Sequence, residues 1–386
     1  MAATCPDRAP FQAASTPVAT EAPQALPKIE AVDTYGEYQR REGLPVITGF
    51  GVEDLRTVEL GTWARRGGKG VFINLDGTGG TNDAYVAEIP PGGQLAPQHQ
   101  LFEELIYVVD GNGATAVWTD PQHKVTFEWK TGSLFAIPLN AWHEHFNGSG
   151  QKPARFFSVT TAPTVMSLFH NLKFVFDTPF SFDDRFSGHD SYFNGEGTLH
   201  WDRIMETNFV PNVHDVELYT WKERGAGGKQ VRFELAHSTM CAHVSEFPVG
   251  TYKKGHRHGP GAHVIVLGGT GYSLLWPEGS SRQRFDWKQG SVVVPPSGWF
   301  HQHFNSGATP ARYLALRWGS RRYRMSEAFS QGEGKTDVDV KQGGAQIEYE
   351  DEDRAIHELF ESELRRHDAP CNMRGMVPWC TGPEKG

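Results

Sequence analysis

The feature that most constrains this 386-residue sequence is an internal repeat with a fixed offset of 158 positions. Tryptophans, glycines, prolines, histidines and asparagines all recur at this offset over about 85 residues, which chance does not produce. The pairs are Trp63/Trp221, Arg66/Arg224, Glu88/Glu246, Gly111/Gly269, Gly113/Gly271, Trp118/Trp276, Trp129/Trp287, Gly132/Gly290, Pro138/Pro296, His143/His301, His145/His303 and Asn147/Asn305. The chain therefore contains two copies of one domain, at about 60–165 and 218–320.

Both copies have the pattern of short strands joined by tight turns. From Trp63 onward, short apolar runs alternate with clusters of Gly, Pro, Asn and Asp. The 43 glycines, 24 prolines and 12% aromatic residues are typical of an all-β fold rather than of a helix bundle. We expect one antiparallel β-barrel per copy, the two packed face to face, with a few peripheral helices.

The composition also predicts how the chain is divided. The expected segments are 1–30, a disordered leader; 31–165, the N-terminal domain; 166–217, an aromatic-rich segment that packs across both domains; 218–325, the C-terminal domain; and 326–386, a C-terminal extension. Within the extension, 351–367 has the pattern of an amphipathic helix, with Ile356, Leu359, Phe360 and Leu364 on one stripe. We expect this stripe to dock on a barrel or on a second copy of the chain, which would make a homodimer.

Charge and cysteine content exclude several classes of function. With 37 basic and 46 acidic residues the formal charge is −9, which argues against a general nucleic-acid or anionic-membrane binder. No run approaches the ~20 apolar residues that a spanning helix needs, and the start shows no secretory signal. The cysteines Cys5, Cys241, Cys371 and Cys380 have no metal-like spacing, so we expect free thiols in the cytoplasm, with a Cys371–Cys380 pair as the alternative.

The second copy carries two histidine motifs about 20 residues apart. Gly250, His256, His258 and Gly269 fit G-x5-H-x-H-x3-[E]-x6-G with Ala262 in the carboxylate position, and Gly290, Pro296, Gly298, His301 and Asn305 fit G-x5-P-x-G-x2-H-x3-N. These segments resemble the paired motifs of the cupin superfamily, and two copies make the chain similar to a bicupin. The resemblance implies jelly-roll barrels of the cupin type, with one divalent metal held inside by the HxH pair, the Glu and the later His.

Strand geometry supports the same ligands independently. Residues i and i+2 of a strand face one side, so His256 and His258 point together while Arg257 points away. His301 on a neighbouring strand closes a facial set of three nitrogens. Imidazole suits Fe, Mn, Co, Ni, Cu or Zn, so the ligand type alone does not choose the metal. The alternative is that these histidines are polar strand residues outside the barrel.

Ala262 is the departure from the family pattern, because it leaves a neutral three-His site. His263 follows the carboxylate position and faces out in a regular strand, but a bulge in the preceding turn would make it a fourth ligand. HRH, the Ala and the closing WFHQH resemble the gentisate and salicylate ring-cleaving dioxygenases, which are bicupins with a three-His Fe(II). That resemblance favours Fe(II), with Mn(II) next.

The first copy has lost the HxH pair. Gln98 and Gln100 stand in place of the two histidines, while Glu104 and His143 keep the other two positions. We expect these four to form a hydrogen-bonded polar cluster. The alternative is a one-residue slip of the strand, which would bring His99, Glu104 and His143 together as a second metal site.

Other side chains near the motifs have two interpretations each. His145 and His303 lie two residues past the last ligand position, where they hydrogen-bond either a bound substrate or the barrel wall. His303 and His263 are the candidates for acid or base catalysis. The arginines of the last strand and beyond form a solvated or bridging patch, or one of them clamps a substrate carboxylate; they are Arg312, Arg317, Arg321, Arg322 and Arg324.

Three functions fit this pattern, because cupin barrels host unrelated activities. The first is a non-haem Fe(II) dioxygenase that cleaves a small molecule able to chelate the metal through oxygen, such as an aromatic acid or a diketone. The second is a metal-dependent lyase, isomerase or decarboxylase that uses the ion as a Lewis acid. The third is a non-enzymatic bicupin that binds a small molecule, which the intact His256, His258 and His301 argue against.

Overall fold

The computed structural model describes residues 28–326, 329 and 335–382, so the leader predicted for 1–30 lies almost entirely outside the described residues. The helices are α1 (Thr34–Glu42), α2 (Ala162–Phe169), α3 (Leu172–Asp177) and α4 (Arg354–Arg366), with 3-10 turns at Asp76–Thr78, Trp201–Arg203, Lys222–Arg224, Val340–Gln342 and Tyr349–Asp351. Strands before the midpoint are β1 (Val46–Ile47), β2 (Gly51–Val52), β3 (Gly61–Trp63), β4 (Gly68–Ile73), β5 (Asp83–Ile89), β6 (Gln94–Gln98), β7 (Glu104–Asp110), β8 (Asn112–Asp120), β9 (His123–Lys130), β10 (Leu134–Ile137), β11 (Trp142–Asn147) and β12 (Ala154–Thr160). Those after it are β13 (Gly197–His200), β14 (Ile204–Thr207), β15 (Phe209–Val210), β16 (Tyr219–Thr220), β17 (Lys229–Leu235), β18 (Met240–Phe247), β19 (His263–Gly268), β20 (Thr270–Trp276), β21 (Gln283–Lys288), β22 (Val292–Val293), β23 (Phe300–Asn305) and β24 (Ala311–Trp318).

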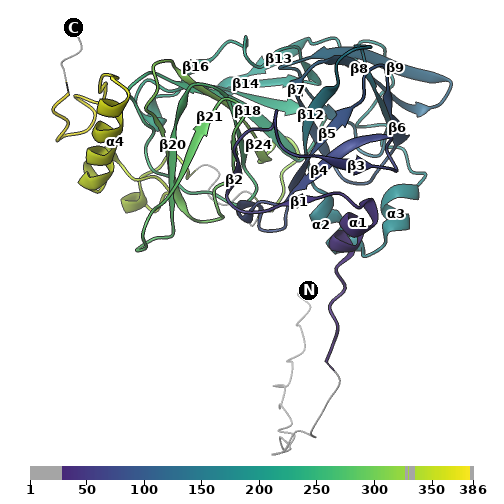
Figure 1. Cartoon of the computed structure of the whole chain (residues 1–386), viewed down its shortest axis with the longest axis horizontal. Coiled ribbons are helices and arrows are strands. Elements are labelled where there is room, and N and C mark those ends of the chain that lie inside the picture. Colours follow the sequence, from purple (N-terminus) through teal and green to yellow (C-terminus); the bar gives the residue numbers. More distant parts are fainter. Residues whose placement is uncertain (1–27, 327–328, 330–334, 383–386) are drawn as a thin grey trace, which may run out of the picture. The chain divides into compact units, whose positions relative to one another are not determined.

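The N-terminal copy folds as two sheets, one large and one small (Figure 1). The large sheet has the strand order β1-β4-β5-β12-β7-β10-β15, with β3 beside β4, and the small sheet has the order β6-β11-β8-β9. Strand β9 shows why the layers form: Val125, Phe127 and Trp129 are buried while the residues between them are exposed. This period of two puts one apolar face toward the interior of the copy.

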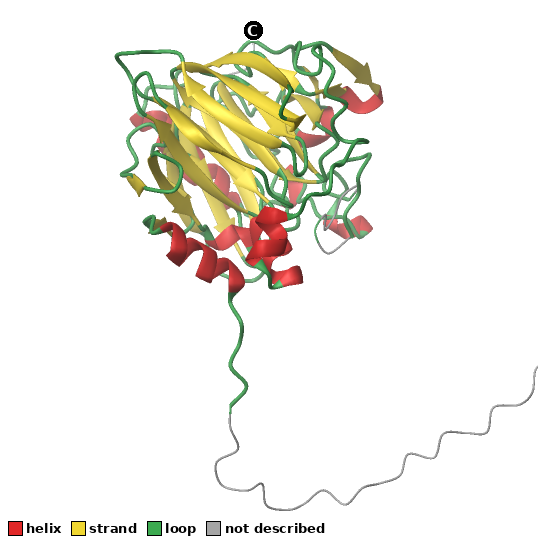
Figure 2. Cartoon of the chain, turned by 90° about the vertical axis from the view of Figure 1, so that its right-hand side faces the viewer, coloured by secondary structure: helices red, strands yellow, loops and turns green. Residues whose placement is uncertain are grey.

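The C-terminal copy repeats this arrangement. Its large sheet has the order β13-β14-β17-β18-β24-β19-β22-β2, with β16 beside β17, and its small sheet has the order β21-β20-β23. Figure 2 shows the strands as layered sheets with the helices around their edges. Each copy is a jelly roll of two sheets, so the predicted all-β class with tandem jelly rolls is confirmed.

The turn glycines show how closely the copies correspond. Gly132 and Gly290 have φ of 92° and 93°, in the left-handed region that favours glycine. The Gly132 amide donates to Val108 and the Gly290 amide to Val266, both at 2.9 Å. The donors and the acceptors are each 158 positions apart, so the offset holds in hydrogen bonding as well as in sequence.

Each copy gives one short strand to the large sheet of the other. β2 precedes the first repeat but pairs with β22, and β15 precedes the second repeat but pairs with β10. These two strands are themselves 158 positions apart. The segment 166–217 adds β13 and β14 to the C-terminal sheet and β15 to the N-terminal one. Buried residues of both large sheets form one apolar cluster that includes Val71, Phe157, Phe233 and Leu314, so the two copies share a core.

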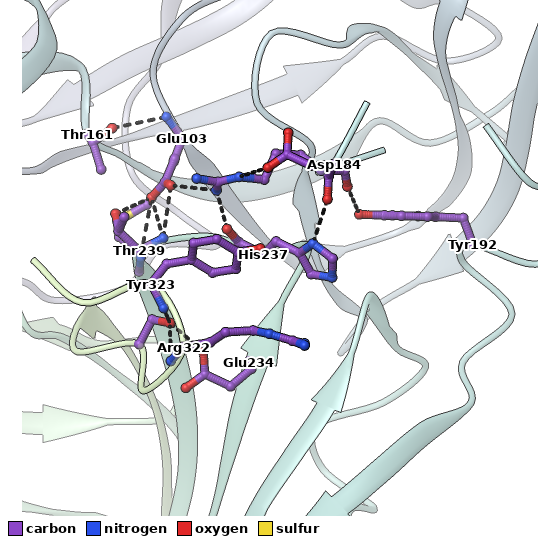
Figure 3. Close-up of polar contacts among 12 residues, drawn as sticks. Glu103, Thr161, Asp184, Tyr192, Glu234, His237, Thr239, Arg322 and Tyr323 are labelled. Carbon is purple, nitrogen blue, oxygen red and sulfur yellow. Dashed lines mark hydrogen bonds and ion pairs between the residues drawn. The ribbon is translucent and has the colours of Figure 1, made fainter. Parts of the chain in front are cut away.

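A buried carboxylate also joins the copies (Figure 3). Glu103, just before β7, accepts hydrogen bonds from the Thr239 amide at 2.9 Å, the Thr239 hydroxyl at 2.5 Å and the Met240 amide at 3.3 Å. Arg185 of the connecting segment lies 3.7 Å from the same carboxylate. The pKa of Glu103 is raised by burial, against the lowering effect of these donors.

The helix expected near 351–367 is present as α4. Asp353 caps its first turn by accepting from the Ala355 amide at 3.0 Å. Ile356, Phe360 and Leu364 of its stripe pack with aromatic residues of the C-terminal copy, so the chain itself covers this face. Figure 1 shows α4 beside β20 of that copy. In the described part of the chain, none of the helices combines the length and apolar character needed to cross a bilayer.

Candidate metal centre

Three histidines of the C-terminal copy converge in one place. His256 lies opposite His301 of β23, and the two backbones exchange hydrogen bonds of 3.1 and 2.9 Å. His258 follows two residues later, and its carbonyl accepts from the Gly298 amide at 2.9 Å. One ligand nitrogen from each of the three rings lies within 4.8 Å of the other two, which is the spacing that a shared ion requires.

The backbone sets the tautomer of each of these rings. The Nδ1 atoms of His256, His258 and His301 lie 3.2, 2.8 and 3.4 Å from the carbonyl oxygens of Lys254, Gly259 and Trp299. A carbonyl only accepts, so each Nδ1 carries the proton and each Nε2 keeps a free lone pair. Burial lowers the pKa of His258 to about 4 and the pKa values of His256 and His301 well below the usual range. Three neutral imidazoles with free Nε2 atoms fit a divalent transition metal.

The trio lies in the wall of a cavity of about 140 Å³ inside the C-terminal copy. Ala262 lines this cavity, so the position that carries a carboxylate in the family pattern faces the interior without one. Apolar and aromatic residues cover much of the remaining wall; they are Trp221, Val264, Tyr313, Ala315, Trp318 and Phe329.

Arginines make the cavity electropositive. The lining residues of the described chain include Arg224, Arg232, Arg317 and Arg321 but only the acids Asp202 and Asp337. Arg224 is paired with Asp337 at 2.7 Å. Arg232 lies 3.5 Å from Asp202, yet its Nε and Nη1 atoms are buried without a hydrogen-bond partner. Unsatisfied guanidinium donors at a cavity wall are suited to a carboxylate ligand.

Sequence reasoning missed Arg232, although its strand carries a signal. In β17, Gln230 and Arg232 line the cavity while Val231, Phe233 and Leu235 belong to the shared core. The strand therefore has one buried apolar face and one polar face that is only partly exposed. Of the arginines singled out by sequence, Arg317 and Arg321 line the cavity, whereas Arg312 binds Glu246 and the Val216 carbonyl.

The structure places the two candidate acid–base histidines differently. His303 lines the cavity, and its Nδ1 lies 2.7 Å from the Ser273 hydroxyl. His263 is buried on the opposite face of β19, where its ring centre is 6.0 Å from that of Phe157 in the N-terminal copy. Because neighbouring residues of a strand alternate, Ala262 at the cavity puts His263 at the junction of the copies, and the structure does not bring it to the other histidines.

The N-terminal copy holds a hydrogen-bonded cluster at the equivalent position, but Gln98, expected in it from the sequence, accepts from Arg65 at 3.1 Å instead. Glu104 accepts from Gln100 at 2.9 Å, from Ser158 at 2.6 Å and from the Tyr85 hydroxyl, and its carboxylate lies 3.9 Å from His143. His143 pairs with Gln98 just as His301 pairs with His256, so the strand does not slip at this point.

His99 therefore points away from this cluster. Its ring stacks on Trp142 with centres 4.2 Å apart, and its Nδ1 is 3.1 Å from the Asn140 side-chain oxygen. His145 is 2.8 Å from the Thr115 hydroxyl, which repeats the His303–Ser273 contact. Since this contact occurs in a copy without the histidine pair, the fold alone accounts for it.

Comparison with known proteins identifies the fold of the repeat. The family model for the cupin domain matches residues 85–160. A segment of 71 residues is 34% identical to a protein named 5-aminosalicylate 1,2-dioxygenase from Comamonas sp, and it covers 18% of this chain and 17% of that protein. Solved structures with a similar arrangement include oxalate decarboxylase from Lactobacillus farciminis (TM-score 0.48, 13% identity, 77% of this chain and 93% of that one). Another is oxalate decarboxylase from Bacillus subtilis (TM-score 0.46, 14% identity, 70% and 76%).

Proposed function

We propose that this chain, a cupin domain followed by a second copy of the same fold, is a non-haem Fe(II) dioxygenase acting on a small anionic molecule that chelates the metal. The observation that carries the proposal is the convergence of one nitrogen from each of three imidazoles on a cavity that also holds guanidinium donors without hydrogen-bond partners. When bound, the ion supplies a Lewis acid and redox chemistry toward O2. The ligands in this proposal are His256, His258 and His301.

The residues of the chain then have separate tasks. Arg232 binds the substrate carboxylate through its Nε, which has no hydrogen-bond partner, and through Nη1, which makes no hydrogen bond although it lies 3.5 Å from Asp202; Arg317 lies on the same cavity wall. Trp221 and Tyr313 pack against the apolar part of the substrate and exclude water. His303, whose pKa burial lowers to about 3, is neutral, and its Nε2 accepts a proton from a substrate hydroxyl when its Nδ1–H donates to the Ser273 hydroxyl oxygen.

An aromatic hydroxy acid is the substrate class that suits these groups best. The neutral ligand set leaves the ion its full charge, which favours an anionic chelate. The name of the similar Comamonas protein specifies an aromatic acid as substrate and a dioxygenase as activity, which supports the same class for this chain.

The test is elemental analysis of protein purified without oxygen, followed by an oxygen-uptake screen against aromatic hydroxy acids and β-diketones. We expect iron at about one equivalent per chain in the C-terminal cavity and stoichiometric oxygen consumption with an aromatic acid. Turnover without oxygen uptake would instead favour a Lewis-acid lyase or decarboxylase. A chain that retains no metal and turns over no substrate would be a binding protein.

A further inference from the structure

A second group of metal-binding side chains lies in the C-terminal extension, outside both jelly rolls. His357 and Glu361 are one turn apart on α4, and Cys371 and Cys380 come from the irregular segment that follows it. One ligand atom from each of the four residues lies within 4.8 Å of the others. None of the four lines the cavity that holds His256, so this group is separate from the centre described above.

The distances within the group have the size of a tetrahedral zinc site. Zinc lies ~2.3 Å from sulfur and ~2.0–2.2 Å from nitrogen or carboxylate oxygen, and the edge of a tetrahedron is about 1.63 times the ligand distance. The expected separations are therefore about 3.8 Å between sulfurs, about 3.6 Å between sulfur and oxygen, and about 3.4 Å between nitrogen and oxygen. The observed distances are 3.5 Å for Cys371–Cys380, 4.0 Å for Cys380–Glu361 and 3.2 Å for His357–Glu361.

The hydrogen bonds around His357 leave its inward nitrogen available. Tyr252 donates its hydroxyl proton to Glu352 at 2.6 Å, so the same oxygen can only accept from His357 Nδ1 at 3.2 Å. His357 Nε2 then keeps its lone pair, which faces the Glu361 carboxylate. Two electron-pair donors 3.2 Å apart need a proton or a metal ion between them, and a metal ion there would also be within reach of both sulfurs.

From this arrangement we infer that His357, Glu361, Cys371 and Cys380 bind a structural zinc ion. Thiolate and imidazole ligands select zinc over magnesium or calcium, and four protein ligands leave no position open for a substrate. Both thiols lose their protons on binding, so the site carries a net charge of −1. The ion joins α4 to residues 371–380, which have few regular hydrogen bonds of their own.

The site also bears on the position of the strand that carries His301. Glu352, which accepts from Tyr252, accepts from Gln302 as well, at 2.6 Å. Gln302 lies between His301 and His303 on β23. The zinc ion therefore holds the extension at the back of the strand that provides part of the proposed metal centre.

The experiment is zinc analysis of the full-length protein purified without chelators. We expect about one zinc per chain bound through two sulfur ligands, which X-ray absorption detects at about 2.3 Å. The double variant Cys371→Ser/Cys380→Ser should lose this zinc and keep the metal of the jelly roll. Cys241→Ala, which changes a buried cysteine outside the group, should keep both metals, and His256→Ala should keep the zinc.

A second measurement covers the case in which the double variant does not fold. Chelator treatment of the wild-type protein should lower its thermal midpoint, and added Zn²⁺ but not Mg²⁺ should restore it. Wild-type protein without zinc would overturn the inference, whether its mass shows a Cys371–Cys380 disulfide or four free thiols. Zinc that is retained by the double variant and lost from His256→Ala would overturn it as well.

Discussion

Replacing Glu103 with alanine tests whether the two copies depend on one buried carboxylate. Glu103 is 6% exposed and belongs to the N-terminal copy. Its partners are Met240, the first residue of β18 in the C-terminal copy, and Thr239, which directly precedes that strand. Removing the Glu103 side chain leaves two backbone N–H groups and one hydroxyl without their acceptor, and it takes the buried carboxylate away from Arg185, which keeps its hydrogen bond to the His237 carbonyl (Figure 3).

The size of the effect follows from these contacts. Hydrogen bonds to a charged group contribute about 1.5–3 kcal/mol each, but they are not additive when they share one acceptor. Breaking a buried charge pair by removing one partner costs about 3–5 kcal/mol, so we expect Glu103→Ala to lose that amount of unfolding free energy. Glu103→Gln keeps one accepting oxygen and should lose about half as much.

Urea unfolding monitored by tryptophan fluorescence measures the loss. The matched control is Asp184→Ala, because Asp184 also lies near Arg185, at 3.6 Å, but is 71% exposed. An exposed pair contributes less than about 1 kcal/mol, so the control should unfold almost as the wild type does. If Glu103→Ala lost no more stability than Asp184→Ala, the junction would not depend on this carboxylate and the reasoning would be refuted.

Three further predictions concern the cavity and the N-terminal copy. His301→Ala should remove the metal from the C-terminal copy. His143→Ala changes the equivalent residue of the N-terminal copy and should leave metal content and oxygen uptake unchanged. The reverse result would place the metal centre in the N-terminal copy. Arg232→Met should raise KM for a carboxylate substrate about 10- to 100-fold, because it removes one charge-assisted contact. Arg322 lies outside the cavity, so Arg322→Met should leave KM unchanged. Equal KM values for the two variants would count against carboxylate binding by Arg232. Burial raises the pKa of Asp83 from 3.8 to about 7, so the folded state holds a proton that the unfolded state has lost. The unfolding free energy of the wild type should therefore fall relative to that of Asp83→Asn as the pH rises from about 4 to about 7, by up to about 4 kcal/mol. Urea unfolding that gives the same stability difference between the two proteins at pH 5 and at pH 8 would contradict this.

The repeat made most of the fold predictable, but not the exchange of β2 and β15. These strands are two residues long, which is too short for the alternation that identifies a strand in sequence. A signal was nevertheless present, because matches at the same offset continue beyond the region where the repeat is strongest. They are Val52/Val210, Val58/Val216, Glu59/Glu217 and Leu60/Leu218. Which sheet a short strand joins depends on contacts between distant residues, and the offset alone does not contain that information.

The sequence predicted the histidine trio but not the zinc group. His256 and His258 are two residues apart on one extended segment, so they face the same side, and His301 lies opposite His256 on the paired strand. Cys371 and Cys380 are nine residues apart in an irregular segment, and only the packing of that segment against α4 brings them to His357 and Glu361. Their ligand geometry is tertiary, so a search for short cysteine motifs does not detect it.

The difference between the two copies explains the cavity of the C-terminal copy. Phe72 lies opposite Tyr85 on strands β4 and β5 of the N-terminal copy, and Arg232 lies opposite His243 on the equivalent strands β17 and β18. Arg232 therefore takes the position of Phe72, and His243 takes the position of Tyr85. By the same pairing, the positions of Glu104, Ser158 and Thr160 are taken by Ala262, Ala315 and Arg317.

These replacements act together on volume and charge. In the N-terminal copy, Tyr85 and Ser158 both donate to Glu104, and all three side chains of this network are buried. In the C-terminal copy two of these positions are alanines, which leaves space, and two others are arginines, which are costly to bury without an anion. Solvent alone in this space would give Arg232 Nε and Nη1 no charged acceptor. A carboxylate bound beside the three histidines would accept hydrogen bonds from both. The C-terminal copy has therefore given up interior packing at the positions where an anionic ligand restores it.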